Sequence, residues 1–165
     1  MIFAKDLHNF FKQKKIDFFT GVPDSVLKNF TKLIEIKKKH VIAANEGNAI
    51  AIASGYYLAK KKIPCVYMQN SGLGNAINPL ASLTHSNVYS IPMLLLIGWR
   101  GSPNQNDEPQ HKTKGIITQE ILKLLKIKNC VINSKKDLKK LNKLLKHSMS
   151  KKEPVACLIK NKTIL

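Results

Sequence analysis

Short apolar segments alternate with longer amphipathic segments along the whole of this 165-residue sequence. The apolar segments have the length of strands, and they cover 16–20, 40–44, 64–69, 92–97, 129–132 and 154–159. Helical spacing of apolar residues fills the intervals, over 6–15, 25–36, 45–61, 73–84, 117–126 and 135–148. Strands that alternate with helices form a parallel sheet covered on both faces. The sequence therefore predicts an α/β fold: a single doubly wound domain over 1–165, with a six-stranded, mainly parallel sheet and helices on both faces.

One connection, from 98 to 115, lacks apolar periodicity and is rich in polar residues. It exceeds the length of an ordinary structureless loop, which favours a function or a partner contact for it. The longest apolar run, 91–97, is far too short to cross a bilayer, and no secretory signal opens the chain. We therefore expect a cytoplasmic protein with no membrane partner.

The net charge of +18 raises the question of a nucleic-acid partner. Arg100 is the only arginine, and lysine lacks the planar fork that suits phosphate and guanine. The lysines also form short scattered clusters near expected helix ends, where positive charge complements the helix dipole; these clusters are 37–39, 60–62, 139–140 and 151–152. We therefore expect no nucleic-acid partner. A basic nucleic-acid binder, whose affinity would depend strongly on salt, stays as an alternative. An acidic protein partner or an anionic small ligand is compatible with the same charge.

Polar, glycine-containing turns follow four of the predicted strands, at 21–25, 45–48, 69–75 and 98–101. The carboxyl ends of parallel strands share one edge of a sheet, and ligands bind at that edge. Helix capping explains about half of these polar residues: Asp24 or Ser25, Asn45 and Ser71 are all competent caps. Capping leaves Gln69, Asn70, Trp99 and Arg100 without a structural reason.

Glu46 is an unusual acid in a chain with only ten Asp and Glu residues. It lies between the apolar segment 41–44 and a helix of small residues over 49–55, where we expect it to be buried. A carboxyl group so placed is a candidate proton-handling residue. The alternative is an ordinary acid in the first turn of a helix, where it meets the positive end of the dipole.

Taken together, these turns resemble the pyrimidine-binding domain of thiamine-diphosphate-dependent decarboxylases. The motifs are Gly-Val-Pro-Asp-Ser at 21–25, Ala-Asn-Glu-Gly-Asn-Ala at 44–49, Tyr-Met-Gln-Asn-Ser-Gly-Leu-Gly-Asn at 67–75, Gly-Trp-Arg-Gly at 98–101 and Asp-Glu-Pro-Gln-His at 107–111. The resemblance covers essentially the whole chain. Within the family it is closest to phosphonopyruvate decarboxylases, and next to the alpha subunits of sulfopyruvate decarboxylases.

The resemblance implies a role for each candidate residue. Glu46 would hydrogen-bond the ring nitrogen of the aminopyrimidine of thiamine diphosphate and favour the imino tautomer that removes the thiazolium proton. The turn formed by Gln69, Asn70, Ser71 and Gly72 would bind the same cofactor. Substrate would contact Asp24, Ser25, Asn70, Arg100 and His111, and His111 would also act in catalysis by moving a proton. Two alternatives are that His111 is a solvated loop histidine, and that Arg100 holds the loop or a subunit contact.

The resemblance also implies a partner. Such enzymes carry a second domain whose Gly-Asp-Gly motif holds Mg2+ and the diphosphate, and no Gly-Asp-Gly occurs in this sequence. We therefore expect no metal ligand on this chain and a companion diphosphate-binding subunit or domain, within a homodimer or a hetero-oligomer. The chain would be an alpha subunit or the leading portion of a longer enzyme, and inactive alone.

The activity implied is decarboxylation of an anionic 2-keto acid, 3-phosphonopyruvate, to phosphonoacetaldehyde and carbon dioxide. One alternative is a sulfopyruvate decarboxylase alpha subunit. The other is a noncatalytic binding or regulatory module that keeps the fold without the chemistry.

Overall fold

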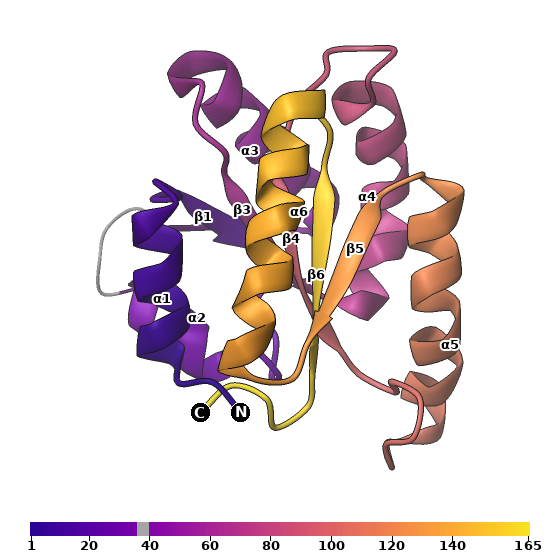
Figure 1. The fold of residues 1–165 in the computed structure, drawn as a ribbon. Helices are drawn as coiled ribbons and strands as arrows, with labels where there is room; N and C mark the ends of the chain where they lie inside the picture. The colour runs from indigo at the N-terminus through magenta and orange to yellow at the C-terminus, as the bar shows by residue number, and fades with distance from the viewer. Residues whose placement is uncertain (36–39) are drawn as a thin grey trace.

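A parallel sheet forms the centre of the molecule in the computed structural model, which describes residues 1–35 and 40–165 (Figure 1). Within these residues the sheet has six strands: β1 Phe19–Gly21, β2 His40–Ile42, β3 Cys65–Gln69, β4 Leu94–Trp99, β5 Lys128–Ile132 and β6 Val155–Lys160. Their order is β2-β1-β3-β4-β6-β5, and every pairing is parallel. The predicted six-stranded parallel sheet is confirmed.

Helices cover both faces of this sheet, as the alternation of segments predicts. They are α1 Ala4–Gln13, α2 Lys28–Glu35, α3 Glu46–Lys60, α4 Leu73–Pro79, α5 Pro109–Leu124 and α6 Leu138–Lys151. One apolar core lies under α1, α2 and α6, and includes Phe11, Phe30 and Leu141. A second core lies under α3, α4 and α5, and includes Ile50 and Leu122. The central strand β4 is buried along its whole length between the two cores.

The strand order places a topological switch point at the carboxyl edge of the sheet. The chain leaves β1 toward β2 on one side, and then crosses back to form β3 on the other side of β1. The turns after β1 and β3 therefore diverge from a topological switch point. Ligands of open α/β sheets bind outside the strand ends at such a point.

Several predicted boundaries differ from the structure by a few residues. The first strand lies at 19–21 rather than 16–20, and the second helix begins at Lys28 rather than at 25. The helix predicted over 73–84 changes at Pro79, which lacks the backbone N–H, and continues as a π-helical turn over Leu80–Thr84. The predicted end of the second helix at 36 and the lysine cluster 37–39 lie outside the described residues.

The prediction of a loop from 98 to 115 is wrong at both ends. Strand β4 continues to Trp99, and α5 begins at Pro109 with proline in its first turn, where its fixed φ suits a helix start. The connection is therefore 100–108, and His111 lies in the first turn of a helix rather than in a loop. Gly101 and Gly115 permit this packing, because a Cβ on either would overlap backbone atoms of the opposite segment.

The two ends of the chain lie side by side on the sheet edge seen at the bottom of Figure 1. Ile2 and Ile164 form an isolated parallel bridge there, and the Ile2 N–H donates to the Thr163 carbonyl at 2.9 Å. Among the described residues, no helix is both long enough and apolar enough to span a membrane.

Candidate functional site

The turns that follow β1, β3 and β4 and the start of α3 meet at the carboxyl edge of the sheet. Side-chain hydrogen bonds join them in pairs: Gln69 with Asp24, Asn70 with Arg100, and Asn75 with Glu46. The partners in these pairs lie between 29 and 45 positions apart in the sequence. The predicted clustering of polar residues at this edge is therefore present in the structure.

Glu46 occupies the first position of α3 and is 9% exposed. The preceding residue, Asn45, caps the helix by accepting a 2.9 Å hydrogen bond from the Asn48 N–H. One Glu46 oxygen, Oε2, accepts a 2.8 Å hydrogen bond from the Asn75 side-chain amide. No described residue donates a hydrogen bond to the other oxygen, Oε1. The carboxyl group is thus oriented through one oxygen, while the second can bind a ligand.

The Glu46 carboxyl group rests directly on Gly72. A Cβ added to Gly72 would overlap the carboxyl atoms, so only glycine leaves room for Glu46 in this position. Gly47 has a related role, because a Cβ there would lie 3.0 Å from the Asn75 carbonyl oxygen. These two glycines allow the start of α3 to approach the turn at 70–72 and the first residues of α4.

Asp24 provides a second buried carboxyl group at this edge. Its Oδ2 accepts from the Leu27 N–H at 3.1 Å, and its Oδ1 accepts from Gln69 Nε2 at 3.2 Å. Gln69 Oε1 in turn accepts a 2.9 Å hydrogen bond from the Ser71 hydroxyl. Burial raises the pKa of Asp24, against the opposing effect of these hydrogen bonds and of the Arg100 charge. Burial therefore favours the acid form of Asp24 more than that of an exposed aspartate.

Arg100 forms a two-pronged ion pair with Asp107 that closes the 100–108 connection. Arg100 Nε donates to Asp107 Oδ2 at 2.8 Å, and Nη2 donates to Oδ1 at 2.5 Å. Asp107 Oδ2 also accepts from the Gly101 N–H, and together these interactions hold the pKa of Asp107 well below its usual range. The remaining Arg100 nitrogen, Nη1, donates to the Ser25 hydroxyl at 3.3 Å. Arg100 therefore holds the loop, and its contact with substrate stays a prediction that only Nη1 is placed to fulfil.

Both polar atoms of the Asn70 side chain form hydrogen bonds within the protein. Its Nδ2 donates to the Arg100 carbonyl at 3.0 Å and to the Thr118 hydroxyl at 2.9 Å, and its Oδ1 accepts from the Arg100 N–H at 3.1 Å. These bonds tie the ends of β3 and β4 to α5. The predicted contact of Asn70 with cofactor or substrate stays a prediction, since it requires one of these bonds to be exchanged.

His111 has a buried ring nitrogen that forms no hydrogen bond with any described residue. Its Nδ1 is inaccessible to solvent and has no hydrogen-bond partner among the described residues. A buried polar atom without a partner is costly, and a ligand or a small rearrangement satisfies it. Within the described part of the chain, no hydrogen bond links His111 to Glu46 or Asp24, so its catalytic role stays a prediction.

Three residues of the site were not identified from the sequence: Asn75, Asp107 and Thr118. Asn75 follows Gly72 by three positions, which places both on one side of a helical turn, and this spacing could have suggested it. Asp107 lies in a segment with the resembled motif but had no assigned role. Thr118 is a buried polar residue of α5 whose sequence carries no signal. Trp99, which was left unexplained, donates from Nε1 to the Gly115 carbonyl at 2.9 Å and packs at the strand end.

The described residues contain no group of three or more His, Cys, Asp and Glu side chains arranged to hold a metal ion. The ionisable side chains at this edge include the carboxyl groups of Glu46, Asp24 and Asp107, the Arg100 guanidinium and the His111 ring.

Comparison with known proteins identifies relatives for most of the chain. Residues 1–124 match the family model described as the thiamine pyrophosphate enzyme N-terminal TPP binding domain. Over 126 residues the chain is 37% identical to a phosphonopyruvate decarboxylase of Streptomyces viridochromogenes. The matched residues cover 75% of this chain and 31% of that protein. Over 97 residues it is 45% identical to a sulfopyruvate decarboxylase subunit alpha of Methanocaldococcus jannaschii, which covers 58% of this chain and 56% of the relative.

A solved structure shares the fold. The benzoylformate decarboxylase of Polynucleobacter necessarius superposes with a TM-score of 0.76 at 20% sequence identity, over 98% of this chain and 30% of that one. This chain thus spans about a third of the Streptomyces enzyme and just over half of the Methanocaldococcus subunit.

Proposed function

The chain belongs to the thiamine pyrophosphate enzyme family through its N-terminal TPP-binding domain, and on that basis we propose that it is the pyrimidine-binding part of a 2-keto acid decarboxylase. The substrate we propose is 3-phosphonopyruvate, which would yield phosphonoacetaldehyde and carbon dioxide. The single observation that carries this proposal is the Glu46 carboxyl group, which is buried at the switch-point edge, is fixed through Oε2 by Asn75, and has no donor to Oε1 among the described residues.

The residues at this edge fit the pyrimidine end of thiamine diphosphate. When bound, this cofactor would supply a nucleophilic carbon for the keto carbon and an electron-accepting ring for the electron pair released with carbon dioxide. Glu46 Oε1 is the atom that would hold a proton against the aminopyrimidine ring. Because little water reaches Glu46, its hydrogen bond to a ligand suffers little competition from solvent. Gly72, which has no side chain, leaves room for the carboxyl group in this position.

Asp24 and His111 are the groups we propose to move protons at the substrate. Burial raises the pKa of Asp24 and so favours its acid form, which would deliver a proton at the substrate. His111, whose Nδ1 has no hydrogen-bond partner among the described residues, would move a second proton. Ser25 and Arg100 Nη1, which already contact one another, would bind the negative group of the substrate. Gln69, Asn70 and Ser71 would shape the wall between cofactor and substrate.

Sulfopyruvate is the second candidate substrate, since the sulfopyruvate decarboxylase subunit of Methanocaldococcus is 45% identical to this chain over the matched residues. The two substrates differ only in the group on carbon three, a phosphonate or a sulfonate. Comparison of kcat/KM for the two acids in the same reconstituted enzyme decides between them, and a preference for sulfopyruvate would replace our assignment.

A companion bearing the diphosphate site and the Mg2+ ligands completes the proposed enzyme. Exposed apolar side chains on the two elements on either side of Asn45 support an interface. On α3 the side chains of Ile52 and Leu58 are exposed, and on the edge strand β2 Val41 and Ile42 are exposed. A homodimer or hetero-oligomer would cover some of these side chains and exclude water from Glu46. We place the enzyme in the cytoplasm, where free thiols such as Cys65, Cys130 and Cys157 persist.

The test is reconstitution. The chain is mixed with a companion subunit that carries Gly-Asp-Gly, with thiamine diphosphate and Mg2+, and carbon dioxide release from 3-phosphonopyruvate is followed. We expect turnover only in the complete mixture. A folded complex that binds the companion yet releases no carbon dioxide from either acid would instead support the noncatalytic module.

A further inference from the structure

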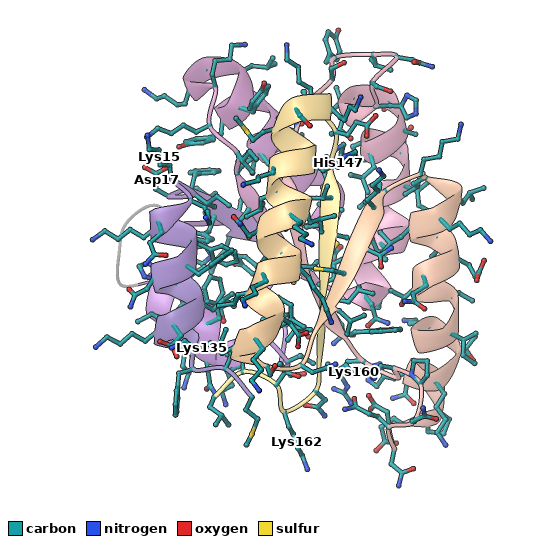
Figure 2. All side chains as sticks on the ribbon, in the orientation of Figure 1. Lys15, Asp17, Lys135, His147, Lys160 and Lys162 are labelled. Carbon is teal, nitrogen blue, oxygen red and sulfur yellow. The ribbon has the colours of Figure 1, made fainter. Side chains whose placement is uncertain are left out.

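A lysine-rich groove lies at the amino ends of the strands, on the opposite edge of the sheet from the candidate site. It runs between the segment after α1, the connection from α3 to β3, and the last turns of α6, and has a volume of about 540 Å3. We call it the basic groove. Figure 2 shows Lys15, one of its members, at the end of the molecule away from Lys160 and Lys162.

The basic groove combines an apolar floor with a cationic rim. The floor consists of Ile16, Ile63, Leu145 and Met149. The rim consists of Lys14, Lys15, Lys61, Lys62 and Lys146, so lysines stand on both sides of the floor. No Asp or Glu lines the groove among the residues that the structure describes. Asp17, just outside it, lies 3.4 Å from Lys62 Nζ.

The five rim lysines are exposed to solvent. Lys14 Nζ lies 5.6 Å from the centre of the Phe10 ring, and Lys61 Nζ lies 5.5 Å from that of Tyr57; both rings lie outside the lining of the groove. Five lysines around one apolar surface concentrate positive charge there. The groove thus accounts for part of the net charge of +18, which the candidate site does not explain.

Two of the rim lysines occupy backbone positions that normally favour glycine. Lys15 and Lys61 have φ of 58° and 53°, in the left-handed region, at the ends of α1 and α3. A residue with a Cβ is disfavoured there by about 1 kcal/mol relative to glycine. Local backbone energetics therefore do not explain lysine at these two positions, and replacement by glycine removes the charge without strain.

We propose that the basic groove is a docking site for an acidic amphipathic helix of a partner protein. The floor would take leucine-like side chains spaced at i, i+3, i+4 and i+7, and the rim would pair with carboxylates on either side of that stripe. The groove suits a helix better than a small polar molecule, because its described lining offers only Asn142 and Ser150 as uncharged hydrogen-bonding side chains. Opposite charge on the two surfaces would also accelerate the encounter at low salt.

The test measures binding of a fluorescent helical peptide with leucines at those positions and glutamates elsewhere, by anisotropy, to the intact chain. Two peptides serve as controls: one of the same composition with the leucines scattered, and one rich in lysine. We expect only the patterned acidic peptide to bind, with an affinity that falls as salt rises. Equal binding of the scattered peptide, or tighter binding of an RNA oligonucleotide, would show general attraction to polyanions and overturn the proposal.

Matched variants locate the site. Lys15→Gly with Lys61→Gly removes two rim charges, and we expect peptide binding to weaken about tenfold at low salt while the chain stays folded. Lys126→Gly with Lys162→Gly is the control, because these lysines also have left-handed φ, 56° and 60°, but lie outside the groove. Equal weakening by the two double variants would overturn the assignment. Met149→Glu, which places a negative charge in the floor, should weaken peptide binding further. Unchanged binding by this variant would also overturn the assignment.

Discussion

The Asn75 side-chain amide donates a 2.8 Å hydrogen bond to Glu46 Oε2 across 29 positions of the sequence. This bond orients the carboxyl group and leaves Oε1 beside Gly72, so α4 helps to set the direction in which a proton can be shared. The first prediction concerns the carboxyl group itself. Glu46→Gln keeps the shape and an oxygen for Asn75, so we expect the free energy of unfolding to change by less than about 1 kcal/mol.

The effect of Glu46→Gln on activity should be much larger than its effect on stability. Because an amide cannot take up the proton that Glu46 holds, we expect kcat of the reconstituted decarboxylase to fall by about a hundredfold or more. Glu108→Gln, at an exposed neighbouring acid, is the control and should leave kcat unchanged. Full activity of Glu46→Gln would remove the proposed proton role.

The second prediction concerns Gly72, the residue on which the Glu46 carboxyl group packs. Gly72→Ala introduces a Cβ that overlaps Glu46, so we expect a loss of about 1–3 kcal/mol in unfolding free energy and a displaced carboxyl group. Gly74, two residues on, has open space at its Cβ position and lies within α4. Gly74→Ala should therefore be neutral or stabilising by up to about 1 kcal/mol. Urea unfolding of both variants measures the difference, and equal effects would contradict the packing argument.

The third prediction concerns the ion pair that closes the 100–108 connection. Asp107→Asn leaves the Arg100 guanidinium without its charged partner, and we expect a loss of about 1–3 kcal/mol in unfolding free energy. The Asp107 side chain is only 6% exposed, so salt should screen the pair weakly. The more exposed pair of Lys62 with Asp17 should matter far less, and Lys62→Gln is the comparison, because Asp17 also accepts a hydrogen bond from the Tyr56 hydroxyl. A similar loss in both variants would indicate that burial does not set the strength of these pairs.

Much of this site follows from the sequence, because it depends on one rule. Parallel strands joined by helices place their carboxyl ends on one edge, so the turns after four predicted strands had to meet. The burial of Glu46 follows in the same way from its apolar neighbours. The strand order is not contained in the alternation, however. Contacts such as Gln69 with Asp24 arise because β3 lies beside β1, and no local pattern specifies that neighbour.

The position of His111 shows a second limit. The residues from 109 to 115 have no apolar stripe, so periodicity predicts a loop where the structure has the first turns of α5. The helix starts there because Pro109 presets its first turn and Gly115 packs closely on Gly101, which is a tertiary contact. Likewise the interactions of Arg100 and Asn70 inside the protein depend on spatial neighbours, and residue type alone suggested ligand binding for both.

The last prediction concerns pH. Burial raises the pKa of Asp24 above its ordinary value of 3.8, so the folded chain binds this proton more tightly than the unfolded chain. Because the folded state then holds more protons between the two pKa values, this residue makes stability fall as pH rises through that interval. Asp24→Asn carries no such proton, so the free energy of unfolding of the original chain, relative to this variant, should decline from acidic toward neutral pH. Urea unfolding of both chains across that range measures the difference, and a relative stability that rises with pH would show that the hydrogen bonds from Leu27 and Gln69 outweigh burial.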